Sequence, residues 1–473
     1  MAVAGLLQSL QPSFMSWRKA SASPPLRKTA YLDGLRGFAA FLVYIMHHEL
    51  WAHSATQTAS IIEFGWGYDD KYALVSFPWI RQFFSGGHSA VACFYVISGY
   101  VLTYKPLQLI LSGNVEKLAD NVASAIFRRW LRLYLPIVGV SLVYVFTIHI
   151  FHLEGNGHHM FETYWEQLLD LYREFMAWSY AFQSKGFVIL WLTYNPHTWS
   201  ITYEMKGSLV IYMTALCTAR FPRTRRWTLY AILIFYFMVL TDGWYIAIFV
   251  TGMWLAELDM HLEAGTLEPP PFLTENSTTL FYGLFISAIF LNGIPNGADN
   301  EMLGRSFGWG FLRHLHPPME DPKWFYLLFS APALVACIPR IWWLRSFFDS
   351  RFCQYLGRIS YSLYLIHGYI LSLFGARIYA AVGFCREGVD DKNFPWWCNR
   401  TPLPQWGIMG LELNFLVAQL ILLPVTFWLS EIVTKLIDEP SVKFAQNTWR
   451  WFLEEDSKPD AKPASLPMST LPP

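Results

Sequence analysis

The stretch LDGLRGFAAFLVYIMH, residues 32–47, determines how the rest of the chain is interpreted. It predicts an apolar helix that carries Arg36 and, eleven residues later, His47. Eleven residues make about three helical turns, so the two side chains share a face and lie roughly 16 Å apart along the axis. A cation and an imidazole are costly in such a run unless they face a polar cavity. Asp33 is placed to pair with Arg36 one turn away.

The composition is that of a membrane protein with several spans. Of the 473 residues, 54% are hydrophobic and 15% are charged, whereas soluble domains carry about 25% charged residues. The formal net charge is +0, so we expect no nucleic-acid partner. The 22 Trp and 25 Tyr residues suit membrane interfaces and an aromatic-lined cavity. The fold class that follows is an all-α integral membrane protein whose partner is the lipid bilayer.

We predict about ten transmembrane helices around a polar cavity, most of them near the ~20 residues that a bilayer requires. The turn Thr241-Asp242-Gly243 divides residues 227–257 into two spans, although one long tilted helix is the alternative. With the division, all basic clusters fall on the cytosolic side, as the positive-inside rule demands. The predicted spans are 35–52, 83–104, 134–153, 198–218, 227–240, 243–257, 279–293, 324–339, 357–376 and 407–430.

This topology puts both chain ends in the cytosol and divides the chain into three parts. Residues 1–30 form an N-terminal segment without a cleavable signal peptide, and residues 31–445 form the transmembrane domain. Residues 446–473 are rich in Pro, Ser and Lys and predict an unstructured tail. The expected location is the endoplasmic reticulum, another endomembrane or the plasma membrane.

Two long loops face the lumen or the outside in this topology. Residues 153–197 are acidic and contain an expected interfacial helix near 161–182. Residues 377–406 contain Cys385 and Cys398, which can form a disulfide if the loop is lumenal.

We expect no metal site. There is no CxxC pair, and His152, His158 and His159 lie in a glycine-containing loop without helical spacing. A Ser-His-Asp hydrolase is disfavoured because no G-x-S-x-G motif is present.

Several motifs follow one another between residues 32 and 440, and their order makes the set specific. They are Arg36-x10-His47, Gly87–Tyr100, Arg128–Tyr134, Trp199–Glu204 (Trp-Ser-x-x-x-Glu), Gly357–His367 and Glu439-Pro440. Together they resemble the membrane-bound acyltransferase 3 family, whose members transfer acyl groups to hydroxyls. His48 adjoins His47, so spacing alone assigns the working histidine.

The resemblance implies a fungal-type O-acyltransferase that uses acyl-CoA, most simply acetyl-CoA, as co-substrate and holds no bound cofactor. The acceptor would be a hydroxyl of a small molecule, such as a terpenoid or polyketide secondary metabolite. Two alternatives remain. The first is a small-molecule exporter. Inverted repeats and paired broken helices would favour it, and the sequence shows neither. A receptor or scaffold with a relict active site would tolerate the loss of His47.

The candidate catalytic residues are His47, Arg36 and Glu204. An imidazole can accept the acceptor's proton near neutral pH, so His47 is the candidate general base. Arg36 can bind a CoA phosphate or order the cavity with Asp33, although an arginine at a helix end also serves as a membrane anchor. Glu204 can orient His47 or bind the acceptor, and the alternative is a hydrated carboxylate at a helix end.

The remaining candidates line the expected cavity. We interpret the basic residues of 128–132 mainly as topology determinants and secondly as donor-phosphate contacts. His367 shares a helix face with Tyr364 and is either a second polar group of the cavity or a structural histidine. Ser98, with Gly99, permits close helix packing. The candidate substrate- and donor-binding residues are Asp33, Ser98, Arg128, Arg129, Arg132, Trp199, Tyr364 and His367.

Overall fold

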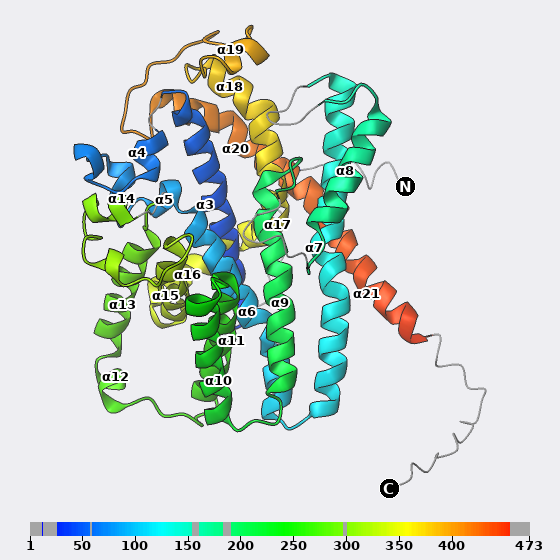
Figure 1. Cartoon of the computed structure of the whole chain (residues 1–473), viewed down its shortest axis with the longest axis vertical. Coiled ribbons are helices and arrows are strands. Elements are labelled where there is room, and N and C mark those ends of the chain that lie inside the picture. Colours follow the sequence, from blue (N-terminus) through cyan, green and yellow to red (C-terminus); the bar gives the residue numbers. More distant parts are fainter. Residues whose placement is uncertain are drawn as a thin grey trace.

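The chain folds into long helices, most of which run side by side (Figure 1). This computed structural model describes residues 12, 26–56, 59–153, 160–182, 191–296 and 300–454, and no strand occurs among them. The helix α3 (Ala30–Ser54), which carries the 32–47 stretch, packs against α6 (Gly87–Leu111) and α17 (Arg351–Ile370). The predicted all-α fold class is therefore confirmed.

Every predicted span overlaps a helix, but fewer than ten of these helices could cross a bilayer. Over the described residues, four are long and apolar enough, and a fifth is gained if a pair bent by 99° counts as one span. The four are α6, Val115–Phe151, Arg351–Ala381 and Leu413–Glu454, and the bent pair joins Lys323–Arg340 to Trp342–Phe348.

The prediction of ten spans is wrong by this measure for two physical reasons. Some helices are too short: α13 (Ser277–Asn292) has 16 residues and α10 (Arg223–Phe235) has 13. Others are long but carry charged side chains among the apolar ones, as α3 does with Asp33, Arg36 and Glu49.

The other helices are bounded as follows. The longer ones are α7 (Val115–Phe151), α8 (Tyr164–Trp178), α9 (Trp199–Cys217), α11 (Trp244–Glu263), α15 (Lys323–Cys337), α20 (Leu413–Val433) and α21 (Glu439–Glu454). The short ones are α4 (Ala59–Glu63), α5 (Gln82–Ser85), α12 (Pro271–Glu275), α14 (Asn300–Arg305), α16 (Trp342–Phe348), α18 (Ala376–Ala381) and α19 (Asp390–Asn393).

Glycines set the closest helix contacts, and these contacts position the polar side chains. Gly37 of α3 lies directly against the backbone of Gly357 in α17, so neither position has room for a Cβ. A Cβ on Gly357 would come within 2.5 Å of the Asp33 carbonyl oxygen. Gly99 of α6 meets the backbone of α11 in the same way, which confirms the close packing predicted for Ser98-Gly99.

Several local predictions can be compared with the structure. The chain breaks at residues 241–243, where Asp242 has φ 51°, so the division of 227–257 into two helices is confirmed. A helix, α8, occupies the segment predicted near 161–182 and begins with a Thr163–Glu166 capping box. Cys385 and Cys398 form a disulfide.

The predicted start of the unstructured tail, residue 446, is wrong because α21 continues to Glu454. Helix α20 continues through the π-helical turn η9 (Thr434–Asp438) into α21, and Figure 1 shows them as one long rod. Residues 446–454 are therefore helical, because the amphipathic sequence of α21 packs against α7. Residues 455–473 lie outside the described residues, as do His158 and His159.

Candidate active site

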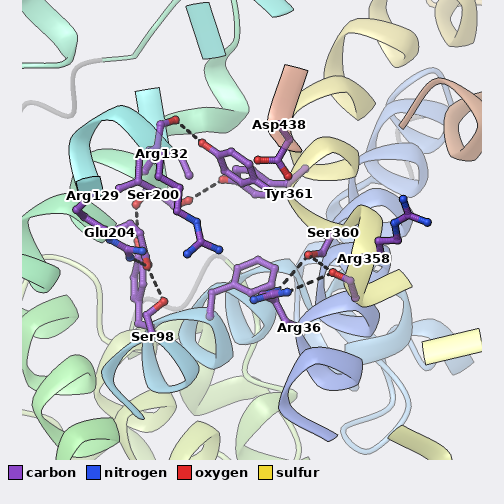
Figure 2. A pocket seen from close by; sticks show the side chains of 16 residues that line it. Arg36, Ser98, Arg129, Arg132, Ser200, Glu204, Arg358, Ser360, Tyr361 and Asp438 are labelled. Carbon is purple, nitrogen blue, oxygen red and sulfur yellow. Dashed lines mark hydrogen bonds and ion pairs between the residues drawn. The ribbon is translucent and has the colours of Figure 1, made fainter. Parts of the chain in front are cut away.

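An open cavity lies among α3, α6, α7, α9, α17 and η9. Its lining combines four arginines with two carboxylates, several hydroxyls and aromatic rings (Figure 2). The charged lining residues are Arg36, Arg129, Arg132, Arg358, Glu204 and Asp438. The cavity can therefore hold an anionic ligand with an apolar portion.

One wall of the cavity is a buried ion pair. The Glu204 carboxylate accepts hydrogen bonds from the Arg129 guanidinium and, at 2.5 Å, from the Ser98 hydroxyl. Arg129 Nε also donates to Ser208 Oγ at 2.9 Å. Figure 2 shows Arg129, Glu204 and Ser98 linked on one side of the cavity. Glu204 thus joins α9 to α6 and α7, and its hydrogen bonds go to these helices.

Arg36 lies on the other side of the cavity, with Ser360 beside it (Figure 2). Its guanidinium is 3.1 Å from the Asp33 carboxylate, which confirms the predicted pairing. Its Nε and NH2 groups donate to Ser360 Oγ at 3.2 Å and to the Gly357 carbonyl at 3.3 Å. The Gly37–Gly357 contact brings α3 and α17 close enough for these bonds. Arg36 is therefore held in place, and its side chain remains 38% exposed.

The remaining arginines differ in how they are satisfied. Arg132 is exposed, and no ion pair or hydrogen bond holds it within the described part of the chain. Arg128 donates to the Ser124 carbonyl at 3.0 Å and lines a neighbouring pocket that shares Arg129 and Arg132 with the main cavity. Arg358 pairs with Glu439 at 3.0 Å. Arg132 is thus the arginine best placed to meet an incoming anion.

His47 lies outside the lining of this cavity, in a cluster of three imidazoles. Its ring centre is 4.0 Å from that of His197 and 5.2 Å from that of His367. These histidines come from α3, from the turn η4 (Pro196–Thr198) and from α17. His47 and His197 are partly exposed, whereas His367 is buried.

Tyr364 stands between the cavity and the histidines. It lines the cavity, and its ring centre is 5.9 Å from that of His367. Its hydroxyl bonds to Ser200 Oγ at 2.7 Å and donates to the His197 carbonyl. Ser200 is free for this bond because α9 begins one residue earlier, with Thr198 at the N-cap position. Tyr364 thus ties the position of His197 to the cavity wall.

His48 belongs to a separate network. Its Nδ1 is 2.8 Å from the Tyr379 hydroxyl, and Gln419 bonds both to that hydroxyl and to the hydroxyl of Tyr44. This network joins α3 to α18 and α20. Of the two adjacent histidines, His47 is the one that faces other candidate site residues.

Trp199 is held by aromatic packing. Its ring centre is 6.2 Å from that of Trp324, which stacks on Trp244 at 3.6 Å. Among the described residues that line the cavity, Trp199 is absent, so its predicted place in the cavity is wrong.

Sequence reasoning missed His197 and Asp438. His197 lies two residues before the Trp199–Glu204 motif, and this proximity was the available signal. Asp438 immediately precedes Glu439-Pro440 and reaches the cavity from the π-helical turn η9, a type of distortion that is frequent at functional sites.

Comparison with known proteins relates the chain to acyltransferases. A family model described as an acyltransferase domain matches residues 29–435. The chain is 25% identical to a protein named O-acetyltransferase PaAT-1 from Phomopsis amygdali, over 95% of this chain and 90% of that protein. No solved structure matches the chain.

Proposed function

Because this chain belongs to the acyltransferase 3 family of membrane O-acyltransferases, we propose that it transfers an acetyl group from acetyl-CoA to a hydroxyl of a small molecule. The observation that carries this proposal is the juxtaposition of an arginine-lined cavity with His47, across Tyr364. An acyl-CoA has a polyanionic end and a reactive thioester end, so it needs both kinds of surroundings.

The arginines supply the contacts for the donor. Guanidinium groups bind phosphate oxygens through paired N–H donors, and Arg132 and the half-exposed Arg36 offer such donors to the cavity. The Arg129 guanidinium is committed to Glu204 and Ser208, so its role is to shape the wall. With the phosphates at Arg132, the thioester arm reaches from the cavity past Tyr364 to His47 in this proposal.

His47 removes the proton from the acceptor. The acceptor oxygen attacks the thioester carbonyl carbon while the imidazole takes the hydroxyl proton, and the carbon–sulfur bond then breaks. The imidazolium returns its proton to the departing CoA thiolate, so the products are the ester and free CoA. General base catalysis of this kind contributes typically 10²–10⁴-fold.

A small apolar alcohol is the acceptor we favour, such as a terpenoid or polyketide secondary metabolite. Support comes from the aromatic rings of Trp199, Tyr203, Trp244 and Trp324, which pack on one another beside the segment that carries His197. Partial exposure of His47 and His197 leaves room for such an alcohol to approach.

We further propose a multi-pass topology with cytosolic termini in an endomembrane or the plasma membrane.

The proposal is tested by measuring free CoA released from acetyl-CoA. Membranes that contain the wild-type chain, His47→Ala or the matched control His48→Asn receive a pooled extract of hydroxylated metabolites as acceptor. We expect release that depends on the extract in the wild-type chain and in His48→Asn, and a loss of at least about 100-fold in His47→Ala. Asparagine keeps a polar atom for Tyr379, so the control changes the neighbouring histidine without opening its network.

Two results would contradict the proposal. Equal release from wild-type and His47→Ala membranes with matched protein levels would remove His47 from the reaction. Acyl transfer that proceeds from another thioester but never from acetyl-CoA would exclude the proposed donor.

A further inference from the structure

The three imidazoles beside Tyr364 form a set of ligand atoms as well as a base. One nitrogen from each of His47, His197 and His367 lies within 4.8 Å of the other two. The three residues come from separate helical elements, so the fold itself brings them together. Three histidines with a fourth position left open are the ligand set of one well-known class of zinc centre.

His367 has its lone pair directed into the cluster. Its Nδ1 is 3.2 Å from the Leu363 carbonyl oxygen, which can only accept, so Nδ1 carries the proton. Nε2 is then the unprotonated nitrogen, and it is buried with no hydrogen-bond partner among the described residues. A metal-bound histidine usually donates its other ring N–H to a carbonyl or carboxylate in this manner. The lone pair of Nε2 is therefore available to bind a metal ion.

Gly368 makes room for the third imidazole. A Cβ at this position would overlap Cδ2 of His197 and lie 2.7 Å from its Nε2. Only glycine at the residue after His367 lets the His197 ring approach α17 so closely. Gly368, which follows His367 in the sequence, thus provides the space that the cluster needs.

The three imidazole nitrogens favour one class of metal ion. Zn–N bonds are about 2.0–2.1 Å, which places tetrahedral ligand nitrogens roughly 3.3 Å apart. The nitrogens must therefore approach by at most about 1.5 Å from their spacing in the structure, a change within the reach of side-chain rotation. Three imidazoles suit Zn²⁺ and its late first-row neighbours, whereas Mg²⁺ and Ca²⁺ require oxygen ligands.

We propose that His47, His197 and His367 form a binding site for a zinc-type divalent ion, and that the bound ion reversibly inhibits acyl transfer. The second half rests on the proposed function. A lone pair of His47 that is shared with the metal cannot take a proton from the acceptor, so occupancy and catalysis exclude each other. No electron transfer is involved, and any proton on a ligating nitrogen is released to water.

Binding is tested on the purified full-length chain in detergent, by titration with Co²⁺ as a spectroscopic probe and by competition with Zn²⁺. We expect one tetrahedral Co²⁺ per chain that Zn²⁺ displaces. Single changes His197→Ala and His367→Ala are expected to weaken binding at least about ten-fold. The exposed His314 supplies the control His314→Ala, which should bind as the wild-type chain does.

Gly368→Ala sharpens the test because it keeps all three histidines. The added methyl group displaces the His197 ring, so we expect binding at least ten-fold weaker, while an unchanged melting transition confirms folding. Equal binding by wild-type and His197→Ala chains, or no binding at all, overturns the site.

Inhibition is measured separately, as CoA release with added Zn²⁺ and after its removal by EDTA. We expect activity to fall with the same Zn²⁺ dependence as Co²⁺ displacement and to return with EDTA. Activity that rises with Zn²⁺ overturns the inhibitory half. The Co²⁺ titration needs no acceptor or donor, so failure of the acyltransferase proposal and failure of the metal site give different results.

Discussion

Arg36 and His47 stand on the same face of α3, about three turns apart, and their surroundings are opposite in character. Around Arg36 the side chains are charged, with Asp33 at 3.1 Å and further arginines along the cavity wall. Around His47 the ring contacts are with two other imidazoles. A guanidinium beside the imidazole would oppose its protonation. The separation lets one region hold an anion while the other accepts a proton.

The largest expected effect tests whether the charges of the cavity wall are structural. Arg129 and Glu204 are both buried, so removal of one partner leaves an uncompensated charge. We expect Glu204→Leu or Arg129→Met alone to cost about 3–5 kcal/mol of unfolding free energy, and the double change to recover most of it. Denaturation in detergent measures these values. Additive losses in the double variant would show that the two side chains act independently.

Two ion pairs show which contacts could be predicted from the sequence and which could not. Asp33–Arg36 was predictable because both residues lie within one helical turn, and the break at 241–243 was predictable because Thr-Asp-Gly interrupts an apolar run. Glu204–Arg129 joins two helices, and no local pattern fixes their rotation relative to each other. The same reason hides His197, whose partners are brought to it only by the packing of α3 and α17.

The number of spans was mispredicted for a different reason. Hydrophobicity along the chain locates apolar runs, but it does not fix the length of the helix that carries each run, and α13 and α10 have only 16 and 13 residues. Helix α3 is long enough to span a bilayer, but it carries polar side chains that bond to neighbouring helices. These side chains make it too polar to count as a span.

A smaller effect separates donor binding from wall structure. Arg132 is exposed and unpaired within the described residues, so Arg132→Gln should leave stability unchanged. We expect its KM for acetyl-CoA to rise about ten- to one-hundred-fold, since a hydrogen bond to a charged group contributes about 1.5–3 kcal/mol.

The matched control for this charge change is Arg225→Gln, an exposed arginine on α10 away from the cavity. It should leave KM as in the wild-type chain. A fall in kcat with constant KM in Arg132→Gln would contradict a donor-binding role and assign this arginine to the chemical step.

The smallest effect concerns the residue that joins the two regions. Tyr364→Phe removes the bonds to Ser200 and to the His197 carbonyl, each of the kind that contributes about 1 kcal/mol. We expect kcat to fall about five-fold, because His197 loses its tether, with KM for acetyl-CoA unchanged. Tyr369→Phe, on the same helix, loses a 3.1 Å bond to Ser141 and should reduce stability alone. If Tyr364→Phe instead raises KM without a change in kcat, Tyr364 belongs to the donor cavity, and the boundary between the two regions lies beyond it, at the histidines themselves.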